Sequence, residues 1–210
     1  MTSHDTFWRF LQAIVADDVA TASRLLAASA DLASVCLVQG ATRRAAVDFY
    51  LEEIQHYVYE GDAALHVAAA GYRHQIARKL LAAGADVRAR NRRGGEPLHY
   101  AADGFPGSAA WNPNAQAATV TVLIEAGADP NATDKSGVTP LHRAVRTRCA
   151  AAVRALLDGG ADADGKNRNG STPMQLAIRN TGRGGSGSPT ARAQQMEIVR
   201  LLEQHGASHG

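Results

Sequence analysis

The octapeptide GVTPLHRA, at residues 137–144, is the stretch that decides the fold. Thr139 is a favourable N-cap residue because its hydroxyl can accept a hydrogen bond from a free N–H of the first helical turn. Pro140 suits the first helical position, where its missing N–H costs no hydrogen bond. The stretch therefore predicts that a turn ends and a helix begins here.

The same pattern recurs along the chain. Its LHxA element starts at Leu65, Leu98 and Leu141 and returns as MQLA at Met174, so the intervals are 33, 43 and 33 residues. A second signature, LLxxGAD or a close variant, closes each copy at 80–86, 123–129, 156–162 and 201–207. Glycine in this signature suits a left-handed helix stop. Each copy is thus predicted to be a helix pair and a turn, and such pairs must stack to bury their apolar faces.

These signatures, in this order, resemble the ankyrin repeat from about residue 58 to the end. The resemblance implies an all-α solenoid of about five helix-pair repeats with β-hairpin fingers. The predicted division is a degenerate repeat at 8–35, an inserted helix at 36–57, and repeats at 58–90, 91–133, 134–166 and 167–210. The alanine-rich copies are also loosely similar to stand-alone bacterial ankyrin proteins.

Composition agrees with closely packed helices in one domain. Hydrophobic residues make up 45% of the 210 residues, but aromatic residues make up only 5%. Cys36 and Cys149 lie far apart and form no metal or redox spacing, which favours a reducing compartment. The first residues form neither a signal peptide nor a membrane span. We therefore expect a cytoplasmic protein that does not contact a membrane.

Charge is unevenly distributed along the chain. Residues 1–62 hold four Arg and nine Asp or Glu, a net charge of −5, whereas residues 63–210 carry a net charge of +7. The resemblance places the fingers (90–93, 134–136 and 166–168) and the first helices on a concave face that meets partners. The residues predicted to bind there are Arg92, Arg93, Tyr100, Lys135, Arg143, Arg146, Arg168 and Arg179.

This basic stripe indicates a non-enzymatic module that binds an acidic protein partner. Nucleic acid is the weaker alternative, because Tyr100 is the main aromatic residue within the stripe. The other interpretation is that the finger tips are merely solvated and basic for solubility. The sequence leaves that choice open.

Three segments do not fit the repeat. Val47, Leu51, Ile54 and Val58 share one helical face, which predicts a helix in the insertion 36–57. The other insertions fall within 103–116 and 179–192, each between the two helices of its repeat. Both could be tolerated surface loops, because added loop length costs little free energy. Loops on a rigid scaffold also often carry function, and the loop residue Trp111 favours that view.

The second functional hypothesis is a sensor of a small anionic ligand, held by the inter-helix loops 103–116 and 180–190. A helix begins at Ser188-Pro189, and helix N-termini attract anions. The residues predicted for this site are Arg146, Arg148, Arg183, Ser188 and Arg192.

No cofactor or catalytic residue is predicted. The stretch GRGGSG at 182–187 matches a dinucleotide fingerprint, but helices rather than strands are predicted on both sides of it. Cys149 follows Arg148 and could be an activated thiol, but a packing role fits its helix start better. No motif places a carboxylate pair for acid–base catalysis.

Metal binding is not predicted either. His66, His99 and His142 occur once per repeat, too far apart to share an ion at bonds of ~2 Å. The resemblance implies instead that each hydrogen-bonds the backbone between neighbouring loops. Glu52 and His56 are spaced as an i, i+4 pair, but one pair is not a metal site.

Overall fold

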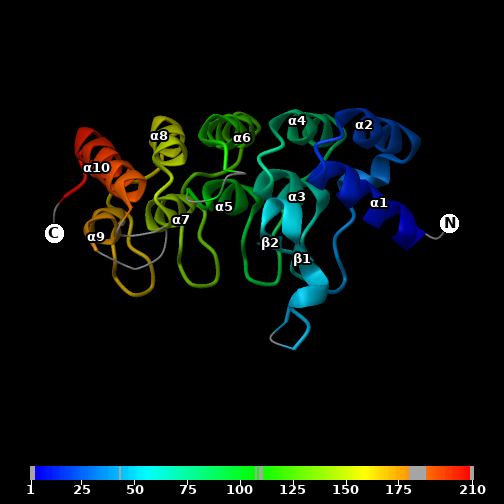
Figure 1. The fold of residues 1–210 in the computed structure, drawn as a ribbon, viewed down its shortest axis with the longest axis horizontal. Helices are drawn as coiled ribbons and strands as arrows, with labels where there is room; N and C mark the ends of the chain where they lie inside the picture. The colour runs from blue at the N-terminus through cyan, green and yellow to red at the C-terminus, as the bar shows by residue number, and fades with distance from the viewer. Residues whose placement is uncertain (1–2, 43, 107, 109–110, 180–187, 209–210) are drawn as a thin grey trace.

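A computed structural model describes residues 3–42, 44–106, 108, 111–179 and 188–208. These residues form five helix pairs that stack in chain order along one axis (Figure 1). The first helices of the pairs are α1 (Ser3–Val15), α3 (Ala64–Ala70), α5 (Pro97–Ala102), α7 (Pro140–Thr147) and α9 (Pro173–Ile178). The second helices are α2 (Val19–Ala28), α4 (His74–Ala82), α6 (Pro113–Glu125), α8 (Ala150–Asp158) and α10 (Pro189–Gln204). The prediction of stacked helix pairs is confirmed.

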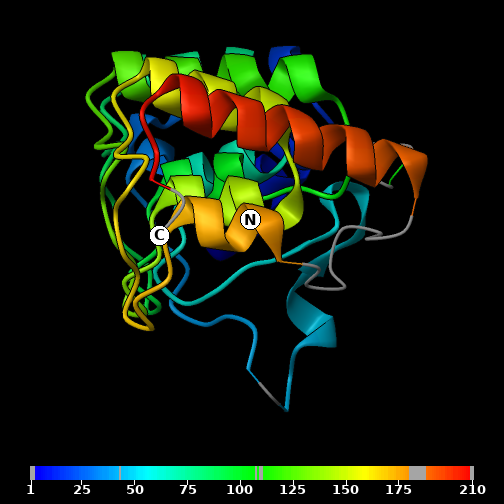
Figure 2. The same cartoon turned by 90° about the vertical axis from the view of Figure 1, so that its left-hand side faces the viewer.

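The helices form two layers (Figure 2). The first helices pack on one another in one layer, as α3 on α5 and α5 on α7, and the second helices form the other, as α4 on α6 and α6 on α8. Leucines at equivalent repeat positions, such as Leu65, Leu98 and Leu141, are fully buried between them. Replacing one such leucine by alanine typically costs about 2–5 kcal/mol. The core is therefore a continuous apolar layer along the whole array.

Capping explains where the helices begin. The Thr139 hydroxyl accepts a hydrogen bond from the His142 N–H at 3.3 Å, and Pro140 occupies the first turn of α7. Thr172 caps α9 in the same way, through the Gln175 N–H at 3.2 Å. The sequence signal at 137–144 is thus a real helix start.

The fingers are tight turns that project from the same side of the array (Figure 2). Their described residues form hairpin turns closed by backbone hydrogen bonds, although these turns are too short to pair as strands. Successive fingers are joined by few backbone hydrogen bonds, and one of them runs from Lys135 N–H to the Arg93 carbonyl at 3.0 Å. Each finger is closed within itself, as by Asp134 N–H to the Val138 carbonyl at 3.0 Å.

The helix predicted within 36–57 does not form. The segment contains two short 3₁₀ helices, η2 (Val47–Phe49) and η3 (Glu52–Ile54), and the strands β1 (Tyr50–Leu51) and β2 (His56–Tyr57), which pair antiparallel. A third 3₁₀ helix, η1 (Ala30–Ala33), lies before it. The expected apolar face has no common surface to cover, because Val47 is 85% exposed and Val58 is buried. A left-handed residue, Gln55, closes the small hairpin instead.

The inserted segment, defined here as residues 36–59, lies against the first-helix layer near α3 (Figure 1). Its start is fixed by hydrogen bonds from Leu37 N–H to the Asp62 carbonyl and from Gly61 N–H to the Leu37 carbonyl, both at 2.8 Å. Farther along, Ala41 N–H donates to the Val58 carbonyl at 2.7 Å. These contacts hold the start of the segment against residues 58–62, which lead into α3.

The three short inter-helix turns share a backbone feature. Asp17, Tyr72 and Arg148 each adopt a left-handed conformation, with φ of 56°, 57° and 62°. This conformation is uncommon for residues other than glycine. These residues lie in the helix pairs without a long inter-helix loop. Two of them, Tyr72 and Arg148, reach the following repeat.

Candidate functional site: the concave face

Side-chain acceptors at equivalent positions shape the three fingers. The Asn91 side-chain oxygen accepts from the N–H groups of Arg93 and Gly95 at 2.9 and 3.0 Å. Asp134 does the same for its own finger at 2.8 and 3.1 Å, and Asn167 at 2.9 and 3.1 Å. The cations that follow these residues therefore project from similar turns, one repeat apart.

Each of the three repeated histidines hydrogen-bonds the start of its own helix and the next finger. In each, Nδ1 accepts from a backbone N–H at the start of its own helix, at 3.0–3.4 Å. Nε2 donates to a carbonyl of the next finger: His66 to Gly95 at 3.2 Å, His99 to Val138 at 3.1 Å, and His142 to Ser171 at 3.0 Å. The structural role implied by the resemblance is confirmed. Burial lowers the pKa of His99 to about 4, so its ring is neutral at pH 7.

Tyr100 is not available to a partner, contrary to the sequence prediction. It is 2% exposed, because His56 of the inserted segment stacks on its ring with centroids 4.6 Å apart. Its hydroxyl lies 2.9 Å from both oxygens of the buried Asp62 carboxylate. The Asn91 amide donates to Asp62 at 2.8 Å and to the Tyr100 hydroxyl at 2.7 Å. This buried network attaches the inserted segment to α5.

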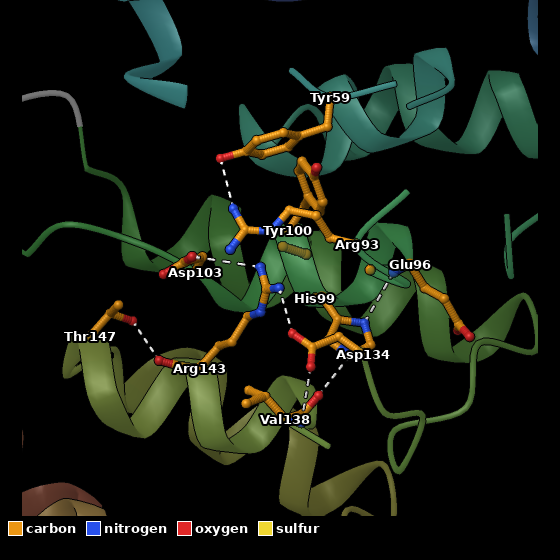
Figure 3. Close-up of polar contacts among 12 residues, drawn as sticks. Tyr59, Arg93, Glu96, His99, Tyr100, Asp103, Asp134, Val138, Arg143 and Thr147 are labelled. Atoms are coloured by element: carbon orange, nitrogen blue, oxygen red, sulfur yellow. Dashed lines mark hydrogen bonds and ion pairs between the residues drawn. The ribbon is translucent and has the colours of Figure 1, made fainter. Parts of the chain in front are cut away.

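Arg143 also turns inward, so it is a structural cation and not an exposed one. Its guanidinium pairs with Asp134 at 3.1 Å and with Asp103 at 3.8 Å (Figure 3), and its side chain is 13% exposed. Partial burial raises the pKa of Asp134, but hydrogen bonds from backbone N–H groups and the Arg143 guanidinium together lower it below its usual value. The repeat pattern around Arg143 does not predict that these two acids would pair with it. Their pairing removes this arginine from the predicted binding stripe.

Arg92 and Arg93 are exposed and rest on Tyr59, at the end of the inserted segment. The Arg93 guanidinium lies 4.9 Å from the Tyr59 ring centroid and donates to its hydroxyl at 3.0 Å (Figure 3). The Arg92 guanidinium lies 5.7 Å from the same centroid and donates to the Ala41 carbonyl. The sequence pattern does not predict Tyr59 as their support, because Tyr59 lies 34 residues before Arg93.

The remaining predicted residues separate into exposed and buried ones. Lys135, Arg168 and Arg179 are exposed, and Arg146 is half-buried. Arg148 is 3% exposed and donates to the Ala191 carbonyl at 3.2 Å and to Gln195 Oε1 at 3.1 Å. It therefore joins α7 to α10. The sequence predicts instead that Arg148 is available to an anion beside the inter-helix loops.

The predicted anion site is only partly described by the structure. Ser188 caps α10 by accepting from the Ala191 N–H at 3.1 Å, and Arg192 is exposed. Arg183 and the GRGGSG stretch lie outside the described residues. The start of the loop 103–116 is hydrogen-bonded to the preceding repeat. The Tyr72 hydroxyl, in the turn between α3 and α4, donates to the Asp103 carbonyl at 2.7 Å.

Cys149, Glu52 and His56 do not form the reactive or metal-binding arrangements that their sequence positions raise. Cys149 is fully buried, and burial raises the pKa of its thiol to about 11, which opposes formation of a thiolate. Glu52 lies in η3 and His56 in β2, so they do not share a helix face. Within the described part of the chain, no group of three His, Cys, Asp or Glu residues is placed to hold a metal ion.

Comparison with known proteins matches most of the repeat region to family models. A model described as "Ankyrin repeats (many copies)" matches residues 123–177. A model described as "Ankyrin repeat" matches residues 60–92 and 94–135. The search of curated proteins found no match. Among the described residues, no helix combines the length and the apolar character needed to span a membrane.

Proposed function

Since this chain belongs to the ankyrin repeat proteins, we propose that it is a non-enzymatic module that binds an acidic surface of a partner protein. Ankyrin repeats imply protein–protein interaction, and the proposal adds the chemistry of the partner. It would be recognised by the exposed cations of the fingers, Arg92, Arg93, Lys135 and Arg168. Half-buried Arg146 and exposed Arg179 extend this surface toward the C-terminus.

One observation carries the proposal: the finger cations are exposed and unneutralised. Across the residues that the structure describes, none of the four forms an ion pair with the chain's own acids. Two cations of the outer layer, which the second helices form, are neutralised within the chain. Arg78 pairs with Glu125 at 3.4 Å, and Arg154 pairs with Glu197. Aligned unpaired charges of one sign attract a surface of the opposite sign and accelerate its association.

The test uses two finger cations whose side chains contact little else. The variant Lys135→Glu/Arg168→Glu reverses charge on neighbouring fingers. The control Arg24→Glu/Lys79→Glu makes the same change of charge on α2 and α4, at exposed positions of the outer layer. Both are used as bait in affinity purification from the native cell, followed by mass spectrometry, and their melting temperatures are compared.

We expect at least one protein with an acidic surface to be captured by the wild type and the control but lost with the finger variant. Raising the salt concentration should weaken its capture, because exposed charges are screened. Melting temperatures should agree within about 2 °C, since surface substitutions usually change stability by less than about 0.5 kcal/mol. Equal capture by all three baits would refute the finger site.

A second candidate function, the sensing of a small anion, has one observation in its favour. Arg148 Nη2 is buried and has no hydrogen-bond partner, and the guanidinium forms no ion pair with the described acids. An unused donor on a buried cation is costly, and an anion beside α10 would satisfy it. Millimolar phosphate should then raise the melting temperature of the wild type more than that of Arg148→Gln. An equal response would remove this candidate.

A further inference from the structure

Two of the inserted segments meet at one cavity. Its volume is about 470 Å³, and it lies between the hairpin 50–56, the turn 70–73 and the loop that follows α5. The residues that bear on its chemistry are Tyr50, Glu53, His56, Asp103, Phe105 and Trp111. A cavity of this size is within the range, roughly 300–1,000 Å³, of small-molecule sites. Neither insertion could form it alone.

The walls of this cavity are held by buried contacts. Gln116 is fully buried, and its amide donates to the Ala101 and Asp103 carbonyls at 3.0 and 3.2 Å. Its Oε1 accepts from the Trp111 indole N–H at 2.9 Å. A Cβ on Gly104 would lie 2.7 Å from Cys149 Sγ, so the loop approaches the helices closely at this glycine. The loop is therefore anchored where it lines the cavity.

The hairpin wall is fitted with similar closeness. Ile54 lies against the turn between α3 and α4, where a Cβ on Gly71 would come within 2.9 Å of its Cγ2. Tyr50 and Tyr57 stack across the hairpin with ring centroids 4.7 Å apart. This packing presents Tyr50 and Glu53 at the cavity on a fixed support.

Two carboxylates and one guanidinium lie in the lining of the cavity, so acidic groups outnumber basic ones there. Glu53 is exposed, and the Asp103 carboxylate has only a distant partner, Arg143 at 3.8 Å, which pairs more closely with Asp134. The lining also contains a cation, Arg73, whose guanidinium donates to the Val15 carbonyl at 2.7 Å and lies 3.8 Å from Asp17, both of which are outside the lining. His56 adds no charge near pH 7, since burial lowers its pKa.

Aromatic rings complete the lining. Tyr50 and Phe105 both line the cavity and are 38% and 55% exposed, so part of each side chain is accessible to a ligand. The π face of an aromatic ring attracts a cation, and a carboxylate nearby adds to that attraction. An anionic ligand would meet Glu53 and Asp103 unfavourably, and a purely apolar ligand would make no use of either carboxylate.

We propose that this cavity binds an organic cation, an ammonium or guanidinium group on an apolar stem. The stem would lie against Phe105 and Trp111, and the cation would lie between the ring of Tyr50 and the carboxylates of Glu53 and Asp103. The inference goes beyond the interaction proposed for the fingers, because these residues lie on other segments and carry the opposite charge. The organic cation would be either a free small molecule or the Lys or Arg side chain of another protein.

The experiment titrates the full chain by calorimetry with two kinds of probe. One arm uses free n-butylamine, tyramine and arginine methyl ester, with n-butanol and butyrate as neutral and anionic analogues of the same stem. The other uses a blocked peptide with one Arg, against the same peptide with norleucine. Whichever arm binds identifies the source of the cation.

We expect the cationic probes to bind and the analogues not to bind. Glu53→Gln and Phe105→Ala should each weaken binding about threefold or more, as the loss of an exposed cation–π or charge contact implies. The matched control, Glu52→Gln, changes a neighbouring exposed acid outside the lining and should bind as the wild type does. Binding unaffected by Glu53→Gln, or absent in both arms, would overturn the proposal. The finger variant should bind amines normally, so the two proposals fail separately.

Discussion

The two halves of the concave face use the same repeat position in different ways. Tyr100 on α5 and Arg143 on α7 both follow the repeated histidine, yet Tyr100 is sealed beneath the inserted segment and Arg143 joins two acids at its edge. Over α3 and α5, the side chains of Asp62, Asn91 and Tyr100 hydrogen-bond to one another within the fold. Beyond them, the described finger cations Lys135 and Arg168 face outward without ion pairs. An insertion can therefore convert part of a binding face into core and leave the rest of the array to meet a partner.

The largest expected effect is acid destabilisation through the histidines that join the halves. Burial lowers the pKa of His99 to about 4, against about 6.5 unfolded, so the unfolded chain binds more protons between these values. Stability is fully present above about pH 6.5 and falls as the pH approaches 4, by about 3 kcal/mol from His99 alone. Burial also lowers the pKa values of His66 and His142, which adds to the loss. Urea denaturation at several pH values measures it.

The chain supplies its own control for this pH effect. In the last repeat Gln175 takes the histidine position, and its Oε1 accepts from the Thr172 N–H at 3.2 Å. The substitution His99→Gln should therefore preserve the local bond and flatten the pH dependence. His205→Gln, at a position exposed on the surface, should leave the slope unchanged. An unaltered slope in His99→Gln would show that this histidine is not the titrating group.

The next largest effect concerns the network that makes the covered half. Asp62→Ala leaves the Tyr100 hydroxyl and the Asn91 amide without their buried acceptor, and also the Tyr59 N–H, which donates to Asp62 at 2.7 Å. We expect a loss of about 3 kcal/mol in unfolding free energy, since each unsatisfied buried group costs about 1–3 kcal/mol. Ser136→Ala, at an exposed finger position, should cost less than about 0.5 kcal/mol. Similar losses for both would contradict a special role for the network.

The two inter-helix loops offer a matched comparison of smaller size. Gln116 and Gln195 occupy equivalent positions in their repeats, and each donates to the carbonyl of an equivalent alanine, Ala101 or Ala177, at 3.0 and 2.7 Å. Gln116 is fully buried, whereas Gln195 is half-buried. Gln116→Ala should cost about 2 kcal/mol and Gln195→Ala about 1 kcal/mol, because water can replace part of the second bond. Thermal denaturation of the two variants tests the order.

The sequence predicted what is local and missed what is distant. The helix starts, the stacked pairs and the histidine braces follow from residues within one repeat. The fate of Tyr100 depends on Asp62, 38 residues away, and that of Arg143 on Asp103 as well as on nearby Asp134. The helix predicted for the inserted segment is wrong, although its apolar spacing fits a helix. The segment forms a hairpin instead, and His56 of that hairpin stacks on Tyr100 of α5. Periodicity reports the face of an element and not the surface that it meets.

The smallest effect tests the boundary between the halves, where Tyr59 of the covered half supports the cation of Arg93. Tyr59→Phe removes the hydrogen bond at 3.0 Å but keeps the ring beneath the guanidinium. Tyr59→Ala removes both, and the difference should be about 0.5–1 kcal/mol, the usual size of an exposed cation–π contact. A double-mutant cycle with Arg93→Ala isolates this coupling from the other contacts of the ring. If the coupling is zero, the inserted segment covers the first half of the face without shaping the second, and the finger cations act independently of it.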